Sequence, residues 1–184
     1  MSTTRILWLD LETTGLDPLK DSILEVGALI TDGDFNEVAR AEWTLQATGQ
    51  MLAVMHPYVE NMHRESGLAA RCLEAKLGMP QVDKECWYFC AAHGVTKASF
   101  LAGNSVGDFD RHFMRRLMPM TNESISHRSI NVSTFKALYS IWDPAAAAPI
   151  LERPKAHRSI LDCEHAIAEL KYWLSLPVPP QFQV

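Results

Sequence analysis

The chain has 184 residues, of which 47% are hydrophobic, and this suits one compact domain with a buried core. Its formal net charge of -5 argues against a protein that grips long nucleic acid through a broad basic surface, but leaves room for a small anionic substrate. The four cysteines show no paired spacing, which favours reduced thiols, and Asp10 interrupts the apolar start that a signal peptide would need. No apolar run approaches the length of a membrane span. We therefore expect a soluble cytoplasmic protein with no membrane contact.

The first predicted strand, at residues 5–11, leads into two acidic side chains. Successive side chains of a strand alternate between its faces, so Asp10 and Glu12 are expected on the same side. Two carboxylates at the end of a hydrophobic strand are costly to desolvate unless a cation compensates them, and a divalent metal is the natural candidate. The pair therefore indicates a functional site.

Two more strands are predicted at residues 22–31 and 37–46, joined by a hairpin turn at 32–34. Residues 50–95 are predicted to form helices, which are interrupted at Pro57, Gly67, Gly78 to Pro80, and Gly94.

The second half of the chain alternates short strands with helices. The predicted elements are a strand at 100–103, a helix at 105–118, a strand at 129–132, a helix to about 142, a loop at 143–155 and a helix at 160–174. The last helix carries an apolar stripe made of Ile160, Cys163, Ile167, Leu170 and Leu174. This order predicts an α/β fold with a mixed sheet flanked by helices, in a single domain at 1–176 followed by a Pro-rich tail at 177–184.

The helix at 105–118 contains a third candidate carboxylate. Asn104 or Ser105 is expected to cap this helix, and Asp110 lies beside its apolar face, where an unpaired carboxylate is unfavourable. The alternative is that Asp108 and Asp110 are both solvated residues of the first turn, favoured by the helix dipole.

The start of the last helix contains a histidine and a fourth carboxylate. Ser159 followed three residues later by Asp162 resembles a capping box, so this helix is predicted to begin just after Ser159. His157 then lies in the preceding loop, free to swing toward the same site as Asp162. The alternative is a capped helix with an exposed histidine.

In this order, Asp10, Glu12, Asp110, His157 and Asp162 resemble the DEDDh family of 3′-to-5′ exonucleases, whose fold is ribonuclease H-like. The resemblance is closest to the oligoribonucleases within that family. Further matching segments are 14–18 with Asp21 and Ile23, the turn at 30–32, 66–68, 101–105, 132–134 with Lys136, and the final His-to-Asp segment.

The resemblance implies a two-metal mechanism acting on short single-stranded RNA oligonucleotides. Asp10 would bridge two divalent cations, Mg²⁺ or Mn²⁺, and Glu12, Asp110 and Asp162 would complete their shells. His157 would act as general base on the attacking water. The product would be a nucleoside 5′-monophosphate released from the 3′ end.

The same resemblance implies a set of substrate contacts. Leu16 would wedge against a terminal base, and Arg128 and its neighbours would come from the partner subunit, which implies a homodimer. The remaining contacts would be made by Tyr58, His63, Ser105 and His127. The alternatives are that Leu16 lies in the core, that His63 lies on a surface helix and that Arg128 is merely solvated.

The chain departs from the family pattern at its second motif. The family's aspartate follows the asparagine of that motif by five residues, whereas Asp110 follows Asn104 by six and Phe109 occupies the expected place. Alignment on Phe113 selects Asp110, and Asp108 remains a rival.

Two competing functions differ in the surface that they require. A broader exonuclease acting on single-stranded DNA or longer RNA would need a basic or aromatic track leading from the site, and the sequence offers only scattered arginines at 111, 115, 116 and 128. A catalytically inactive nucleotide-binding module is disfavoured because all five motif positions are filled.

Overall fold

The computed structural model describes residues 4–151 and 157–177. Its centre is a five-stranded sheet in the order β3-β2-β1-β4-β5. The strands are β1 (Ile6–Thr13), β2 (Ile23–Thr31), β3 (Glu37–Thr44), β4 (Phe100–Gly103) and β5 (Ser129–Asn131). Strand β2 runs antiparallel to both β1 and β3, whereas β4 runs parallel to both β1 and β5. The predicted mixed sheet and its β2–β3 hairpin are therefore confirmed.

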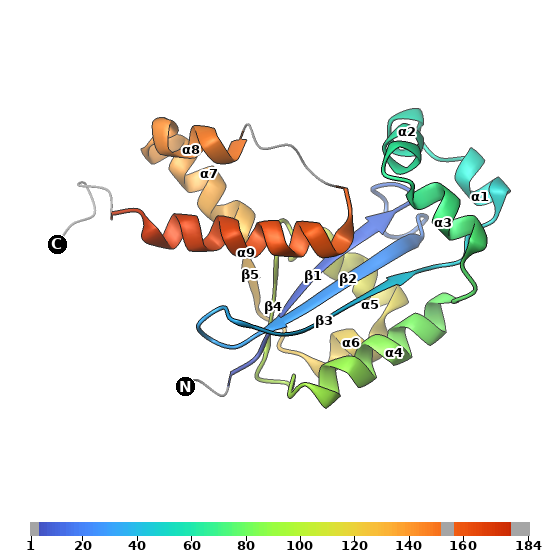
Figure 1. Cartoon of the computed structure of the whole chain (residues 1–184), viewed down its shortest axis with the longest axis horizontal. Coiled ribbons are helices and arrows are strands. Elements are labelled where there is room, and N and C mark those ends of the chain that lie inside the picture. Colours follow the sequence, from blue (N-terminus) through green and yellow to red (C-terminus); the bar gives the residue numbers. More distant parts are fainter. Residues whose placement is uncertain (1–3, 152–156, 178–184) are drawn as a thin grey trace.

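Helices cover both faces of this sheet (Figure 1). They are α1 (Gly49–Ala53), α2 (Pro57–Glu65), α3 (Leu68–Glu74), α4 (Met79–Ala92), α5 (Asp110–Leu117), α6 (Pro119–Ser124), α7 (Val132–Trp142), α8 (Pro144–Leu151) and α9 (Ser159–Ser175). The helix breaks predicted between residues 50 and 95 agree with the observed boundaries of α2, α3 and α4.

The alternation of β1 assigns its side chains to two separate cores. Leu7, Leu9 and Leu11 pack on the side of α4 and α5, whereas Ile6 and Trp8 pack on the side of α7, α8 and α9. Asp10 and Glu12 continue the even-numbered series, so β1 directs both carboxylates toward the face that α9 covers (Figure 1).

Two predictions about the middle of the chain are wrong. Helix α5 begins at Asp110 rather than at 105, and neither Asn104 nor Ser105 caps it, because Ser105 has a left-handed φ of 54° and its amide donates to Asn131 and Ser133. The loop predicted at 143–155 contains helix α8, whose start is favoured by a proline at N1 and by the Asp143 carboxylate, which accepts the Ala146 amide. Residues 152–155 of that loop lie outside the described residues.

The end of the chain needs two smaller corrections. Leu174 is 57% exposed, and the buried stripe of α9 runs instead through Cys163, Ala166, Leu170 and Trp173. Apart from Pro177, the tail predicted at 177–184 lies outside the described residues. Among the described residues, no helix is both long and apolar enough to cross a membrane.

Candidate active site

Three carboxylates meet where β1 ends beneath the first turn of α9. Asp10, Glu12 and Asp162 each offer a carboxylate oxygen, and these oxygens lie within 4.8 Å of one another. Glu12 is buried and the other two are half-buried. Like charges this close repel, so the arrangement favours a cation that neutralises them.

A glycine in β2 allows α9 to approach the sheet closely enough to deliver Asp162. Gly27 is the cross-strand partner of Asp10. A Cβ atom at Gly27 would lie 2.5 Å from the Ser159 carbonyl carbon and 2.6 Å from the Ile160 nitrogen, so only glycine leaves room for the first turn of α9. The Asp162 carboxylate in turn accepts the Arg158 amide at 3.2 Å, which fixes it at the start of the helix.

The start of α9 differs from the predicted capping box. Arg158 is the N-cap and Ser159 is already the first helical residue. The Ser159 hydroxyl donates to the Glu25 carboxylate at 3.1 Å instead of capping the helix. The capping-box prediction was therefore wrong, because a tertiary contact with β2 replaces the local one.

Asp110 approaches the same end of β1 from the opposite side of the sheet. The ladder between β1 and β4 covers Ile6 to Trp8, and beyond it the amide of Leu11, between the two β1 carboxylates, donates to the Asp110 carboxylate at 3.0 Å. Asp110 is only 2% exposed, so it is not the solvated residue of the alternative interpretation. Its burial raises its pKa to about 7, against the opposing effect of hydrogen bonds from its own amide and that of Leu11.

Asp110 also acts electrostatically on Cys163, the residue after Asp162. Burial and then the charges of Asp10, Asp110 and Asp162 raise the pKa of the Cys163 thiol well above its usual value. Asp108, by contrast, is exposed and accepts the side-chain amide of Asn131 at 2.7 Å. The structure therefore brings Asp110, and not Asp108, to β1.

One histidine lies beside a carboxylate of the group, and a second lies near that histidine. His63 of α2 is fully buried; its Nε2 donates to the Thr13 carbonyl at 2.8 Å and its Nδ1 lies 3.8 Å from Glu12 Oε2. The alternative of a surface position for His63 is therefore wrong. His157 is half-buried and has a left-handed φ of 51°. The pKa of His63 is lowered mainly by burial, and the nearby charge of His157 lowers it further.

The donor chemistry of this site fits a hard divalent cation. Its metal-ligating candidates are carboxylates on β1 and α9, with the buried Asp110 beside them. Oxygen donors of this kind suit Mg²⁺ or Mn²⁺, which need no thiolate.

The predicted substrate contacts fall in two separate regions of the chain. Leu16 is 79% exposed on the loop after β1, so the core alternative for it is wrong, and Tyr58 is 68% exposed at the start of α2. Ser105, His127 and Arg128 are exposed near β4 and β5, away from that loop in the chain. Arg128 is solvated in the single subunit, so its contact across a dimer stays a prediction.

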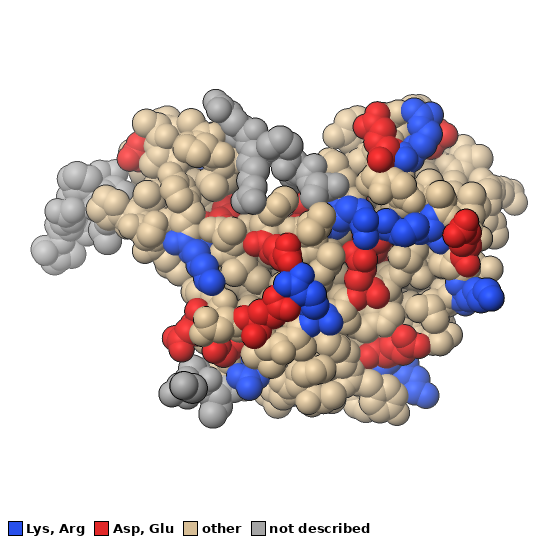
Figure 2. Space-filling model, viewed as in Figure 1, with Lys and Arg blue, Asp and Glu red and all other residues tan. Residues whose placement is uncertain are grey.

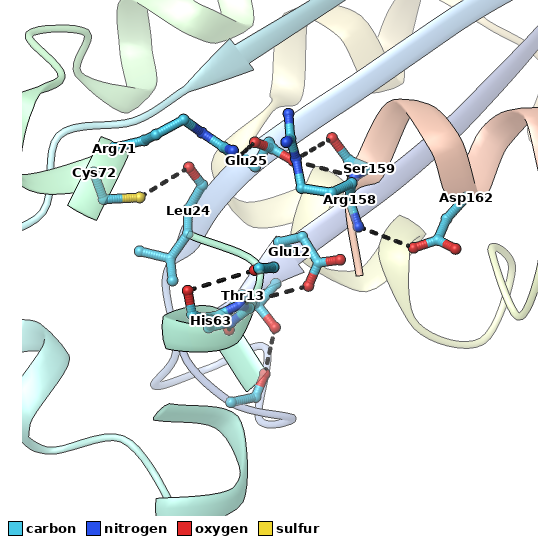
Figure 3. Close-up of polar contacts among 12 residues, drawn as sticks. Glu12, Thr13, Leu24, Glu25, His63, Arg71, Cys72, Arg158, Ser159 and Asp162 are labelled. Carbon is cyan, nitrogen blue, oxygen red and sulfur yellow. Dashed lines mark hydrogen bonds and ion pairs between the residues drawn. The ribbon is translucent and has the colours of Figure 1, made fainter. Parts of the chain in front are cut away.

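Glu25 is a residue that the sequence interpretation missed. It is fully buried in β2, directly opposite Glu12, and it contacts Ser159, Arg158 and Arg71 (Figure 3). The signal that could have identified it is a single acidic residue inside the apolar run 23–30.

Comparisons with known proteins identify the family. An exonuclease family model, RNase_T, matches residues 7–170. The chain is 33% identical over 174 residues to the oligoribonuclease of Colwellia psychrerythraea, covering 94% of this chain and 95% of that protein. It is 34% identical over 171 residues to the oligoribonuclease of Corynebacterium glutamicum, covering 92% and 78%.

A solved structure supports the fold. Escherichia coli exonuclease I in complex with a dA16 oligonucleotide matches 92% of this chain with a TM-score of 0.67 and 16% identity, and this chain spans 40% of that one. At this identity the match is evidence for the fold alone, and it confirms the predicted ribonuclease H-like fold. The family model and the relatives matched along nearly the whole sequence confirm the family predicted from the motifs: the chain belongs to the oligoribonuclease family of exonucleases.

Proposed function

We propose that this chain is a cytoplasmic 3′-to-5′ exoribonuclease that converts short RNA oligonucleotides to nucleoside 5′-monophosphates with two divalent cations, Mg²⁺ or Mn²⁺. Its family membership makes it a 3′-to-5′ exonuclease that hydrolyses phosphodiester bonds. The observation that carries the proposal is the meeting of Asp10, Glu12 and Asp162 within 4.8 Å, with Asp110 bound to the amide between the first two.

The four carboxylates would hold the ions together. Asp10 is paired with Gly27 of β2 and precedes Leu11, whose amide donates to Asp110, and it would contact both ions. Glu12, Asp110 and Asp162 would complete the shells of these ions. Two ions bound there supply Lewis-acid stabilisation of the attacking and leaving oxygens during an in-line displacement.

His157 would accept the proton of the attacking water. An imidazole exchanges protons near neutral pH, and His157 precedes the helix that carries Asp162. The water oxygen forms a new bond to phosphorus while its proton passes to His157. The bond from phosphorus to the O3′ of the preceding nucleotide breaks, and that oxygen takes a proton from solvent while His157 later returns its own to solvent, so the terminal nucleotide departs with its 5′-phosphate.

The charge distribution favours short substrates. On the face shown in Figure 2, basic side chains adjoin in one short band at the middle right and are otherwise interspersed with acidic ones, so no long basic track crosses this face. Affinity for long nucleic acid depends on many phosphate contacts, whereas a short oligonucleotide presents few phosphates to neutralise. The exposed Leu16 and Tyr58 suit contact with bases at the 3′ end, and their exposure supports that role.

A homodimer completes the proposed substrate site. Ser105, His127 and Arg128 are exposed near β4 and β5, where a second subunit has access to them. The arginine suits a phosphate because its planar, permanently charged group donates two parallel hydrogen bonds. The four free, buried cysteines agree with a reducing cytoplasm.

The competing function is a broader exonuclease on single-stranded DNA or longer RNA, and the fold shared with an oligonucleotide-bound exonuclease I is its support. One assay separates the two. Labelled RNA dinucleotide, pentamer and twenty-mer, with matching DNAs, are incubated with Mn²⁺ or with EDTA, and Asp10→Asn is the inactive control. We expect metal-dependent release of monophosphates, fastest from the short RNAs. Equal processing of the twenty-mer would refute the short-substrate proposal, and no release at all would refute both activities.

A further inference from the structure

A fifth carboxylate lies on the same face of the sheet as the candidate metal ligands. Glu25 is fully buried, and the β1–β2 register pairs it directly with Glu12. Opposite residues in an antiparallel pair point to the same face, and two like charges placed there destabilise the sheet unless one is compensated. Glu25 therefore needs partners that account for its burial.

The protein itself supplies those partners (Figure 3). Glu25 Oε1 accepts the amide and the hydroxyl of Ser159, each at 3.1 Å, and lies 3.5 Å from Arg158 Nε. Its Oε2 forms an ion pair with Arg71 of α3. Both oxygens are thus engaged, two arginines balance the charge, and Glu25 is not among the carboxylates grouped around the candidate metal position.

These contacts attach the start of α9 to β2. Ser159 lies between His157 and Asp162 in the chain, and Glu25 contacts it through both its backbone and its side chain. Two residues along β2, Gly27 leaves the space that the same turn of α9 fills. Glu25 therefore anchors the turn, and Gly27 lets it come close.

We propose that Glu25 is a positioning residue: by binding Ser159, it holds the first turn of α9 so that His157 and Asp162 face Asp10 and Glu12. This inference rests on the proposed function of those four residues. Glu25 touches neither substrate nor metal, and it acts through the segment that it anchors.

The test compares Glu25→Gln and Ser159→Ala with the wild type. The first keeps the shape but turns an amide group toward Arg71, and the second removes one donor to Glu25 while keeping the backbone one. Three quantities are measured: hydrogen exchange of the 157–165 segment, Mn²⁺ affinity by calorimetry, and kcat and KM on an RNA dinucleotide. For Glu25→Gln we expect faster exchange, weaker Mn²⁺ binding and a kcat lower by about 10- to 100-fold, the usual effect of losing a residue that supports metal ligands.

Asp83→Asn provides a matched control for a purely structural effect. Asp83 is also buried, and it accepts the amides of Met120 and Thr121 and the Thr121 hydroxyl at 2.8 to 3.0 Å, which anchors the first turn of α6. It has the same kind of contact as Glu25 but serves a helix that carries none of the proposed ligands. We expect it to lower thermal stability while kcat, Mn²⁺ affinity and exchange of the 157–165 segment stay at wild-type values.

The outcomes are distinct. Wild-type kcat, Mn²⁺ affinity and exchange in Glu25→Gln would overturn the proposal, and so would an equal loss of kcat in Asp83→Asn. If Glu25→Gln does not fold, Ser159→Ala decides: a lower kcat in the folded variant supports the proposal and an unchanged kcat overturns it. A wild type that binds Mn²⁺ but cleaves no oligonucleotide would refute the proposed function, while exchange and Mn²⁺ affinity would still judge the role of Glu25.

Discussion

Replacing Gly27 with alanine tests whether the close approach of α9 to β2 builds the site. The added Cβ would lie 2.5 Å from the Ser159 carbonyl carbon and 2.8 Å from the Ser159 Cβ, whereas ordinary contacts begin near 3.4 Å. These are backbone and short side-chain atoms that cannot rotate away. The first turn of α9 must therefore retreat by about 1 Å, and overpacking of this kind costs about 1–3 kcal/mol of stability.

The functional effect of Gly27→Ala is expected to exceed its effect on stability. A retreat of the helix carries His157 and Asp162 away from Asp10, and a misplacement of about 1 Å can cost about 100-fold in rate. We expect kcat to fall by about that factor, with KM much less affected, in a protein that still unfolds cooperatively. Steady-state kinetics on an RNA dinucleotide and thermal unfolding measure the two effects.

Gly49→Ala is the matched control for this substitution. A Cβ at Gly49 meets nothing within 4 Å, so the same chemical change should leave both kcat and stability at wild-type values. A folded Gly27→Ala variant with wild-type kcat would refute the argument that this glycine sets the position of α9.

Three further predictions concern single carboxylates and the loop after β1. Asp110→Asn should lower kcat by more than about 100-fold, which is the upper limit for residues that only support metal ligands. Asp108→Asn should leave kcat unchanged, because Asp108 is exposed and contacts Asn131. The opposite result in parallel assays would identify Asp108 as the ligand. In metal-free protein, burial raises the folded-state pKa of Asp110 to about 7 from a usual value of 3.8, so the folded state holds the extra proton and its stability should fall as pH rises from about 4 to 7. Urea unfolding in EDTA should find this decline smaller in Asp110→Asn, and an equal decline would contradict the assignment. Leu16→Ala should leave stability unchanged, since the side chain is 79% exposed. It should raise KM roughly tenfold, because burying this side chain against a base is worth about 1.5 kcal/mol. An unchanged KM would remove Leu16 from the substrate site.

Local sequence patterns were sufficient for the sheet and for half of the site. The alternation of β1 places Asp10 and Glu12 on one face because strand periodicity is a local property. The hairpin between β2 and β3 follows from its turn residues, and the order of strands and helices specifies the layered α/β class.

What the sequence did not predict depends on contacts between distant residues. The start of α9 was misplaced because the Ser159 hydroxyl binds Glu25, 134 positions earlier in the chain. The alignment on Phe113 selected Asp110 but kept Asp108 as a rival, because the contact that separates them, with the Leu11 amide beyond the short β1–β4 ladder, joins residues far apart in the chain. Helix α8 was missed because its two prolines suggested a loop, although one of them occupies the helix-compatible first position.

The proposed function requires that β1, α5 and α9 together form a binding site for divalent cations. The most direct measurement is the anomalous difference density of a crystal grown with Mn²⁺ and a nucleoside 5′-monophosphate. We predict two Mn²⁺ peaks among Asp10, Glu12, Asp110 and Asp162, with the phosphate bound to them. Mn²⁺ bound elsewhere, with these four carboxylates contacting no metal, would contradict the proposed two-metal site.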